Sequence, residues 1–272
     1  MSNFISVIAR RGREERLAQG AGGLTFTTVL SLVPLLAVSF ALFTRIPALR
    51  GVGEAMREYL LRGLLPPEIV RVVLKQLAQF TRNAGGLTLV GSLFLLVSAL
   101  GLLLSIENAL NRIWQVKKPR PLLKRLGLYL AILLAGPVLL GAGLWAASAL
   151  LPRSGLLAGT GLQSLLGLAP MAVAAAAFTC LFLCVPHAPV RWREAIVGGL
   201  LAGAAFELGK RGFALYLAGV PTYRTVYGAF APLLAFLVWV YYSWFVILAA
   251  ALVSASLPGG GGRPRARRAA RA

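Results

Sequence analysis

Apolar residues dominate the chain in long continuous runs, and this pattern predicts helices that cross a membrane. Each run reaches about the 20 residues that a helix needs to span the hydrocarbon core of a bilayer. The runs do not alternate apolar and polar residues, which disfavours a transmembrane β-barrel, and backbone groups in lipid must then bond within helices. The sequence therefore predicts an all-α, polytopic membrane protein with six transmembrane helices. These spans are residues 24–44, 85–106, 126–151, 162–186, 194–220 and 228–257.

Composition supports lipid as the main solvent of this chain. Hydrophobic residues make up 58% of the 272 residues and charged residues only 13%, whereas soluble domains contain about 25% charged residues. A chain this apolar cannot cover its own surface with polar groups. The first span is long and lacks a convincing small-residue cleavage site, so we expect it to be retained and not removed as a signal peptide.

The links between the spans define the expected domain organisation. Residues 1–23 form a basic cytoplasmic N-terminus, and residues 24–257 form the transmembrane domain. The long link 45–84 has a helical period in EIVRVVLKQLAQFTR and predicts two short amphipathic helices on the outer side. Residues 258–272 have no apolar face to bury and predict a disordered, basic cytoplasmic tail.

Charge sets the expected orientation. The formal net charge is +20, from 28 Lys and Arg against 8 acids, and every acid is a Glu. Basic residues gather before the first span, between the second and third spans, and after the sixth, so both termini are expected in the cytoplasm. The same residues predict binding to anionic lipid head groups, and nucleic acid is disfavoured as a partner. A homo-oligomer is left open.

Small residues spaced by four follow the fifth span and predict close helix packing. Ala195, Gly199 and Gly203 lie on one stripe, and small residues at this spacing let a neighbouring helix approach. The stripe continues to Glu207 and Arg211. We therefore expect its charged end to face protein as well.

The segment AAFELGKRG, residues 204–212, places three charges inside this apolar span. Glu207 and Arg211 have the favourable i,i+4 order for an ion pair, and Lys210 lies three residues after Glu207. A loop here would leave two helical pieces too short to cross a bilayer. Two interpretations stay open: a structural ion pair with snorkelling cations, and a polar cavity with a transport-like role.

The second span has its own small-residue face. Gly91, Ser98 and Gly101 share it and predict a second site of close helix packing.

Polar residues also occur at the end of the second span and within the first. Glu107, Asn108 and Asn111 lie in SIENALNRIW, where the favoured interpretation is a helix end with Glu107 paired to a nearby Lys or Arg. Pro34 lies inside the first span and removes one backbone hydrogen bond, close to Ser31. All five join Glu207, Lys210 and Arg211 as a hypothetical intramembrane polar cluster.

Catalytic and metal chemistry is disfavoured. Cys180, Cys184 and His187 are close in sequence, but zinc needs four ligands or three plus water, and no fourth candidate is adjacent. Two-metal phosphoryl chemistry needs clustered carboxylates, and this chain has no Asp and scattered Glu residues. We therefore expect no metal, no cofactor and no enzymatic activity.

Three stretches together resemble the YihY/BrkB family of bacterial inner-membrane proteins. They are AGGLTFTTVLSLVPLLAV, SIENALNRIWQVKKPRP and YGAFAPLLAFLVWVYYSWFVILAAAL, and the resemblance covers about residues 20–257. It implies six transmembrane helices, a cytoplasmic basic tail and an inner-membrane location. A ribonuclease BN label attached to the family is regarded as a misassignment. Members often carry an acid near the end of the last span, where this chain has Ala251.

These observations favour one function and leave two others. The first is a transporter or permease with a polar intramembrane cavity, because ionisable residues inside membrane spans mark such pathways. The alternative is a non-catalytic scaffold that binds lipid or assists membrane assembly. The third, a ribonuclease, is disfavoured.

Overall fold

The computed structural model describes residues 2–45, 89–132, 169–219 and 228–257, and every regular element in these ranges is helical. This confirms the all-α prediction for the described part of the chain. Residues 122–132 are also helical. The main helices are α1 (Ser2–Glu14), α2 (Leu17–Arg45), α5 (Leu89–Ile113), α8 (Ala169–Cys184), α9 (Trp192–Gly219) and α11 (Ala231–Ser256), and a short 3-10 turn, Gly228–Phe230, precedes α11.

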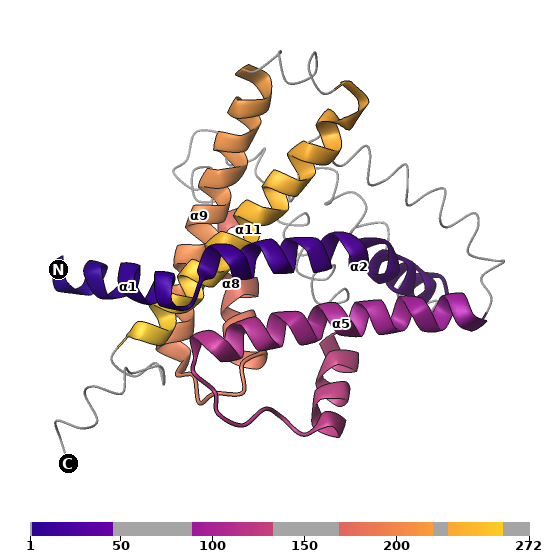
Figure 1. Cartoon of the computed structure of the whole chain (residues 1–272), viewed down its shortest axis with the longest axis horizontal. Coiled ribbons are helices and arrows are strands. Elements are labelled where there is room, and N and C mark those ends of the chain that lie inside the picture. Colours follow the sequence, from indigo (N-terminus) through magenta and orange to yellow (C-terminus); the bar gives the residue numbers. More distant parts are fainter. Residues whose placement is uncertain (1, 46–88, 133–168, 220–227, 258–272) are drawn as a thin grey trace, which may run out of the picture.

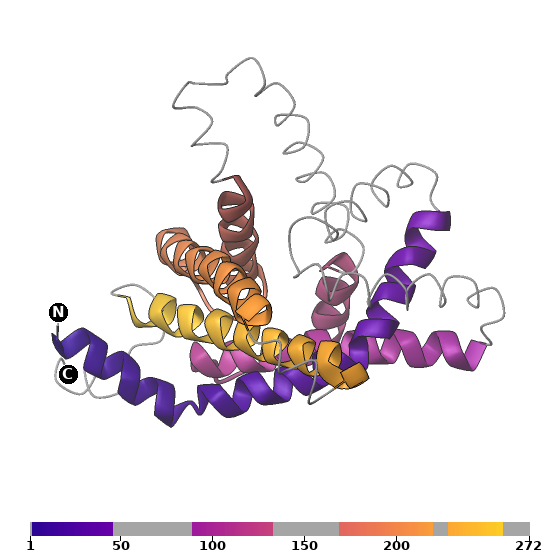
Figure 2. The same cartoon turned by 90° about the horizontal axis from the view of Figure 1, so that it is seen from above.

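Helix α11 occupies the centre of the arrangement. It contacts α1, α2, α5 and α9, while α8 packs along α9 and α5 packs along α2. Figures 1 and 2 show α2 and α5 side by side, with α11 crossing them and α9 next to α11. The most apolar described helix is therefore surrounded by the others, as expected when helices bury their least polar surfaces.

Two described segments are long and apolar enough to cross a membrane. They are Leu96–Ile113 in α5 and Leu233–Ser256 in α11, and a shorter apolar segment, Met171–Cys184, lies in α8. These windows overlap the predicted second, sixth and fourth spans. The predicted outer link 45–84, the tail 258–272 and most of the third span lie outside the described residues.

The small-residue stripe of α9 packs against α8, as predicted. Ala195, Gly199 and Gly203 are buried. A Cβ atom at Gly203 would lie 2.9 Å from the backbone nitrogen of Ala175, and one at Gly199 would lie 2.7 Å from the carbonyl oxygen of Ala175. The two backbones approach this closely only because glycine has no side chain.

One part of the α9 packing prediction is wrong: Arg211 is exposed, so the last residue of the stripe does not face protein. In α5, a Cβ atom at Gly101 would meet no described atom within 4 Å, so the small-residue face of this helix stays a prediction. Gly91 lies in the same helix, and the backbone oxygen of Ser98 contacts α2 instead by accepting a hydrogen bond. A straight stripe drifts around a helix with distance, which explains why only part of it faces a partner.

Aromatic residues fasten α11 to α9. Trp239 is only 2% exposed and packs edge-on against Phe206 and at a tilt against Phe213, with ring centroids 5.3 Å apart in both pairs. The Tyr242 hydroxyl donates to the carbonyl of Ala205 at 2.8 Å. These contacts give Trp239 and Tyr242 a packing role between the two helices.

Helix α2 begins at Leu17, earlier than the span predicted from hydropathy. Leu17, Ala21 and Leu24 are all buried, so tertiary packing extends the helix beyond its most apolar run. Pro34 lies within α2, and Figure 2 shows this helix changing direction along its length. An internal proline commonly produces such a bend.

Candidate functional site

The most deeply buried charged group is the carboxylate of Glu107. This residue lies on α5 inside the apolar window Leu96–Ile113, and its side chain is 0% exposed. Its Oε2 accepts a 2.5 Å hydrogen bond from the Tyr129 hydroxyl, and its Oε1 accepts one of 3.2 Å from Asn111 Nδ2. Arg125 Nε lies 3.3 Å from Oε1 and forms an ion pair without good hydrogen-bond alignment. Both carboxylate oxygens are therefore compensated.

Asn111 extends this cluster to a third segment. Its Oδ1 accepts a 2.7 Å hydrogen bond from the backbone N–H of His187, while its amide nitrogen donates to Glu107. Only one orientation of the amide satisfies both contacts, because the opposite orientation would face its N–H₂ toward a donor and its oxygen toward a carboxylate. We call Glu107, Asn111, Arg125 and Tyr129 the Glu107 network. It joins α5 to the helical residues 122–132 and to the turn after α8.

Two further arginines act at the same end of the molecule, where α5 and α8 terminate. Arg11 is 3% exposed, and it donates to the carbonyl of Ile113 at 3.2 Å and to Ser256 Oγ at 2.8 Å. Arg120 donates to the carbonyl of Cys184 at 3.2 Å. Both contacts place positive charge on the last carbonyls of a helix, where the helix dipole favours it. Burial lowers the pKa of Arg11 from its ordinary value, and nearby carboxylates oppose that shift.

The second predicted charge cluster is smaller and local. Glu207 Oε2 lies 2.7 Å from Lys210 Nζ, and the two side chains are 21% and 19% exposed. The predicted pairing of Glu207 with Arg211 is therefore replaced by the i,i+3 pair, while Arg211 is exposed. The segment 204–212 is helical throughout, which rules out the loop.

The predicted polar residues thus divide into separate groups instead of one cluster. Glu107 and Asn111 are together, and Glu207 and Lys210 are together. Ser31 Oγ donates to the carbonyl of Ser98 at 3.0 Å and ties α2 to α5. Asn108 is exposed and stands apart from the network beside it on the chain.

The cysteines and the histidine make ordinary contacts. The sulfur atoms of Cys180 and Cys184 lie 3.8 Å apart on the exposed side of α8, and His187 Nδ1 lies 3.2 Å from the carbonyl oxygen of Lys118. Among the described residues, no three His, Cys, Asp or Glu side chains are placed to hold a metal ion.

Arg125 and Tyr129 are functional candidates that the sequence reasoning missed. The expected partner of Glu107 was a nearby Lys or Arg, and the structure identifies Arg125. One signal was available: Arg125 and Tyr129 are four residues apart and share a helical face. The sequence does not show that this face turns toward α5.

The fold and the site define a class: an all-helical protein with membrane-length apolar helices and a compensated carboxylate inside one of them. The family described as virulence factor BrkB matches residues 8–272. The chain belongs to this family, in agreement with the resemblance read from its three stretches.

Relatives with similar sequences carry the name UPF0761 membrane protein. One from Ralstonia nicotianae is 47% identical over 252 residues, covering 92% of this chain and 57% of the relative. One from Paraburkholderia xenovorans is 42% identical over 257 residues, covering 92% and 58%, respectively. One from a Janthinobacterium strain is 42% identical over 266 residues, covering 94% and 60%.

The chain therefore spans about three fifths of the length of the curated relatives it matches. No solved structure matches it.

Proposed function

We propose that this protein is a transporter-like, multi-pass protein of the bacterial inner membrane, with six spans and both termini in the cytoplasm. In this proposal the Glu107 network is the cytoplasmic gate. The observation that carries the proposal is the fully buried carboxylate of Glu107 inside an apolar helix. The names of its relatives and the apolar windows support the membrane location.

The energetic argument starts from the cost of burying charge. A buried ion pair is often no more stable than apolar residues of similar volume, because desolvation offsets the attraction. Stability alone therefore gives little reason to place Glu107 and Arg125 among Leu102, Ile106 and Leu110, which are all buried. Ionisable groups inside membrane spans are rare and mark pathways and switches, so a functional role explains the carboxylate better.

The connectivity of the network supports a gate. Glu107 and Asn111 lie on one helix, Arg125 and Tyr129 lie on another, and the His187 backbone belongs to a third segment. These contacts hold the three segments together where α5 and α8 end. Breaking them separates the segments, and re-forming them closes the gap, as rigid-body gating between helices requires. The excess of basic residues makes an anionic solute the expected cargo class.

A swelling assay tests this proposal. The purified full chain is placed in proteoliposomes with valinomycin, which lets K⁺ follow the anion, and stopped-flow light scattering follows swelling in isosmotic potassium phosphate. Glu107→Gln keeps the shape of the side chain but weakens the ion pair with Arg125, so we expect swelling at least threefold faster than for the unmodified protein. Glu14→Gln is the matched control, because Glu14 is exposed and belongs to α1.

The assay also separates a gate from a purely structural cluster. If Glu107→Gln lowers the melting temperature and leaves swelling equal to that of the Glu14→Gln control, the network stabilises the fold and the gate is wrong. Equal swelling in all three proteins and in empty liposomes, with potassium chloride and potassium glutamate as further probes, would contradict transport altogether.

We also propose that the protein is not an enzyme. The carboxylate of Glu107 is enclosed by its partners, and Glu207 is paired with a lysine. Metal-dependent cleavage of RNA by the purified chain would overturn this.

A further inference from the structure

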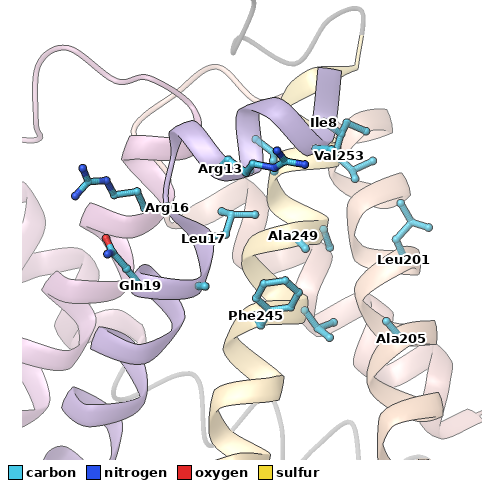
Figure 3. A pocket seen from close by; sticks show the side chains of 16 residues that line it. Ile8, Arg13, Arg16, Leu17, Gln19, Leu201, Ala205, Phe245, Ala249 and Val253 are labelled. Atoms are coloured by element: carbon cyan, nitrogen blue, oxygen red, sulfur yellow. The ribbon is translucent and has the colours of Figure 1, made fainter. Parts of the chain in front are cut away.

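A groove lies between the junction of α1 and α2 on one side and α9 and α11 on the other. Its volume is about 760 Å³, within the range of about 300–1,000 Å³ that is typical of small-molecule sites. Its walls are apolar, and Figure 3 shows side chains from all of these helices lining it. The apolar lining includes Ile8, Leu17, Leu201, Phe245, Ala249 and Val253.

The groove has a charged mouth. Arg13, Arg16 and Gln19 also line it, and both arginines are exposed. Figure 3 shows Arg13 extending across the upper end of the groove toward Val253, whereas the side chains of Arg16 and Gln19 extend to the other side of α2. Within the described part of the chain, the acid next to Arg13, Glu14, pairs with Arg10 at 3.6 Å. A second acid, Glu15, lies beside Arg16, but residues 10–16 contain four arginines against these two glutamates, so the mouth keeps a net positive charge.

The backbone around the mouth is held in an unusual conformation. Arg16 has a φ of 51°, a left-handed value that residues other than glycine adopt infrequently. It separates α1 from α2, and the two helices are close at this junction, since a Cβ at Gly12 would lie 3.3 Å from Leu17 Cδ1. The sharp junction places α1, with its arginines, against the end of α11.

We propose that this groove binds one anionic glycerophospholipid of the cytoplasmic leaflet. The apolar wall from Phe245 to Val253 lies inside the membrane-length window of α11 and runs about 12 Å along that helix. An acyl chain lies along this wall, and the phosphate lies at Arg13 with Arg16 close by. Arginine suits a phosphate because its guanidinium donates two parallel hydrogen bonds.

Charge decides between this lipid and other occupants. The chain's own tail, residues 258–272, carries five arginines and no acid, so it is repelled by the basic mouth. A zwitterionic lipid fits the apolar wall and also carries a phosphate, but its head group is neutral overall, so it lowers the positive charge of the mouth less than an anionic lipid does. A second copy of this chain has the same basic N-terminus and meets the same repulsion. An anionic lipid can pack its acyl chain against the apolar wall and place its negative charge at the basic mouth.

Native mass spectrometry of the full chain in detergent tests the site, with dioleoyl-phosphatidylglycerol and dioleoyl-phosphatidylcholine as probes. We expect the unmodified protein to retain phosphatidylglycerol in preference to phosphatidylcholine. The double variant Arg13→Gln/Arg16→Gln is expected to lose about 25-fold in phosphatidylglycerol affinity, at about fivefold for each basic residue near the head group. Its phosphatidylcholine affinity is expected to fall clearly less, because that head group has no net charge.

Lys117→Gln/Lys118→Gln is the matched control. These lysines are exposed and are expected on the same side of the membrane, but they do not line the groove. A second variant, Ala18→Trp, fills the mouth from an exposed position, so it blocks both lipids without disturbing a buried contact. A circular dichroism melt confirms that each variant is folded.

Three results would overturn the proposal. The first is an equal loss in the arginine and lysine variants, which indicates diffuse attraction to the basic surface. The second is equal retention of the two lipids by the unmodified protein. The third is unchanged lipid retention in Ala18→Trp, or a dimer in place of bound lipid. None of these results bears on Glu107, so the lipid site and the proposed gate are tested independently.

Discussion

Glu107 and Glu207 each lie within an apolar stretch of the sequence. In the folded protein, however, the environments of the two carboxylates differ. The side chain of Glu107 is fully buried, and its oxygens contact Asn111, Arg125 and Tyr129. The side chain of Glu207 is 21% exposed, and its ion pair is with Lys210 on the same helix. The partners of Glu107 come mainly from another helix, whereas the partner of Glu207 lies one turn away.

The difference shows what each carboxylate can do. A pair within one turn of a single helix forms whenever that helix forms, so its making and breaking reports nothing about the arrangement of helices. A network across three segments exists only while those segments are together. Only the Glu107 network can therefore couple the protonation, occupancy or movement of one segment to another.

The largest expected effect comes from removing the buried carboxylate. Glu107→Ala leaves Arg125, whose side chain is 13% exposed, without its counter-charge. Breaking a buried pair on one side costs about 3 kcal/mol or more. SDS-induced unfolding in bicelles measures this cost, and Glu207→Ala serves as the comparison. Equal losses for the two alanine variants would remove the distinction between the sites.

A smaller effect is expected from removing one member of the network. Tyr129→Phe leaves the ring in place but deletes the hydroxyl, which donates a 2.5 Å hydrogen bond to Glu107 Oε2. Hydrogen bonds to charged groups contribute about 1.5–3 kcal/mol in soluble proteins, while polar contacts between membrane helices average about 0.6 kcal/mol. We expect a loss of about 1.5 kcal/mol in the same unfolding assay. Tyr241→Phe, at an exposed position of α11, is the control and should change stability little.

The sequence predicted the helical class and a close helix contact along the small residues of α9, but not that α8 is the partner. Hydropathy identified where α5, α8, α9 and α11 lie, since long apolar runs admit few alternatives. The spacing of Gly199 and Gly203 predicted close approach, because it depends only on residues within one helix. Helix ends were predicted less well: α2 starts earlier than its apolar run, because buried contacts at Leu17 and Ala21 extend it.

The partners in the candidate site could not be predicted in the same way. Several basic residues lie between the second and third spans, and nothing in their order selects Arg125 as the partner of Glu107. The contact of Asn111 with the His187 backbone joins residues 76 positions apart. Helical periodicity specifies which residues share a face, but the direction of that face depends on how separate helices pack.

A third prediction concerns function at the half-buried pair of Glu207 and Lys210. Glu207→Gln weakens the ion pair with Lys210 but leaves every contact of the Glu107 network intact. We expect proteoliposome swelling in potassium phosphate to stay within about 1.5-fold of that of the unmodified protein, a difference below about 0.3 kcal/mol in barrier height. Swelling as fast as that of Glu107→Gln would indicate that the Glu207–Lys210 pair on α9 is part of the gate.

The smallest effect, and the sharpest test of the comparison, is the coupling energy within each pair. For Glu207 and Lys210, a double-mutant cycle of the two single glutamine variants and their double variant should give a coupling of about 0.5 kcal/mol, as in other i,i+3 and i,i+4 pairs. The same cycle for Glu107 and Arg125 should give a clearly larger value, because the double variant removes both buried charges at once and so recovers part of the loss. Unfolding in bicelles supplies the seven free energies, because the two cycles share the unmodified protein. Equal couplings would mean that burial adds nothing to the pairing of Glu107, and the case for the network as a gate would then rest on its connectivity alone.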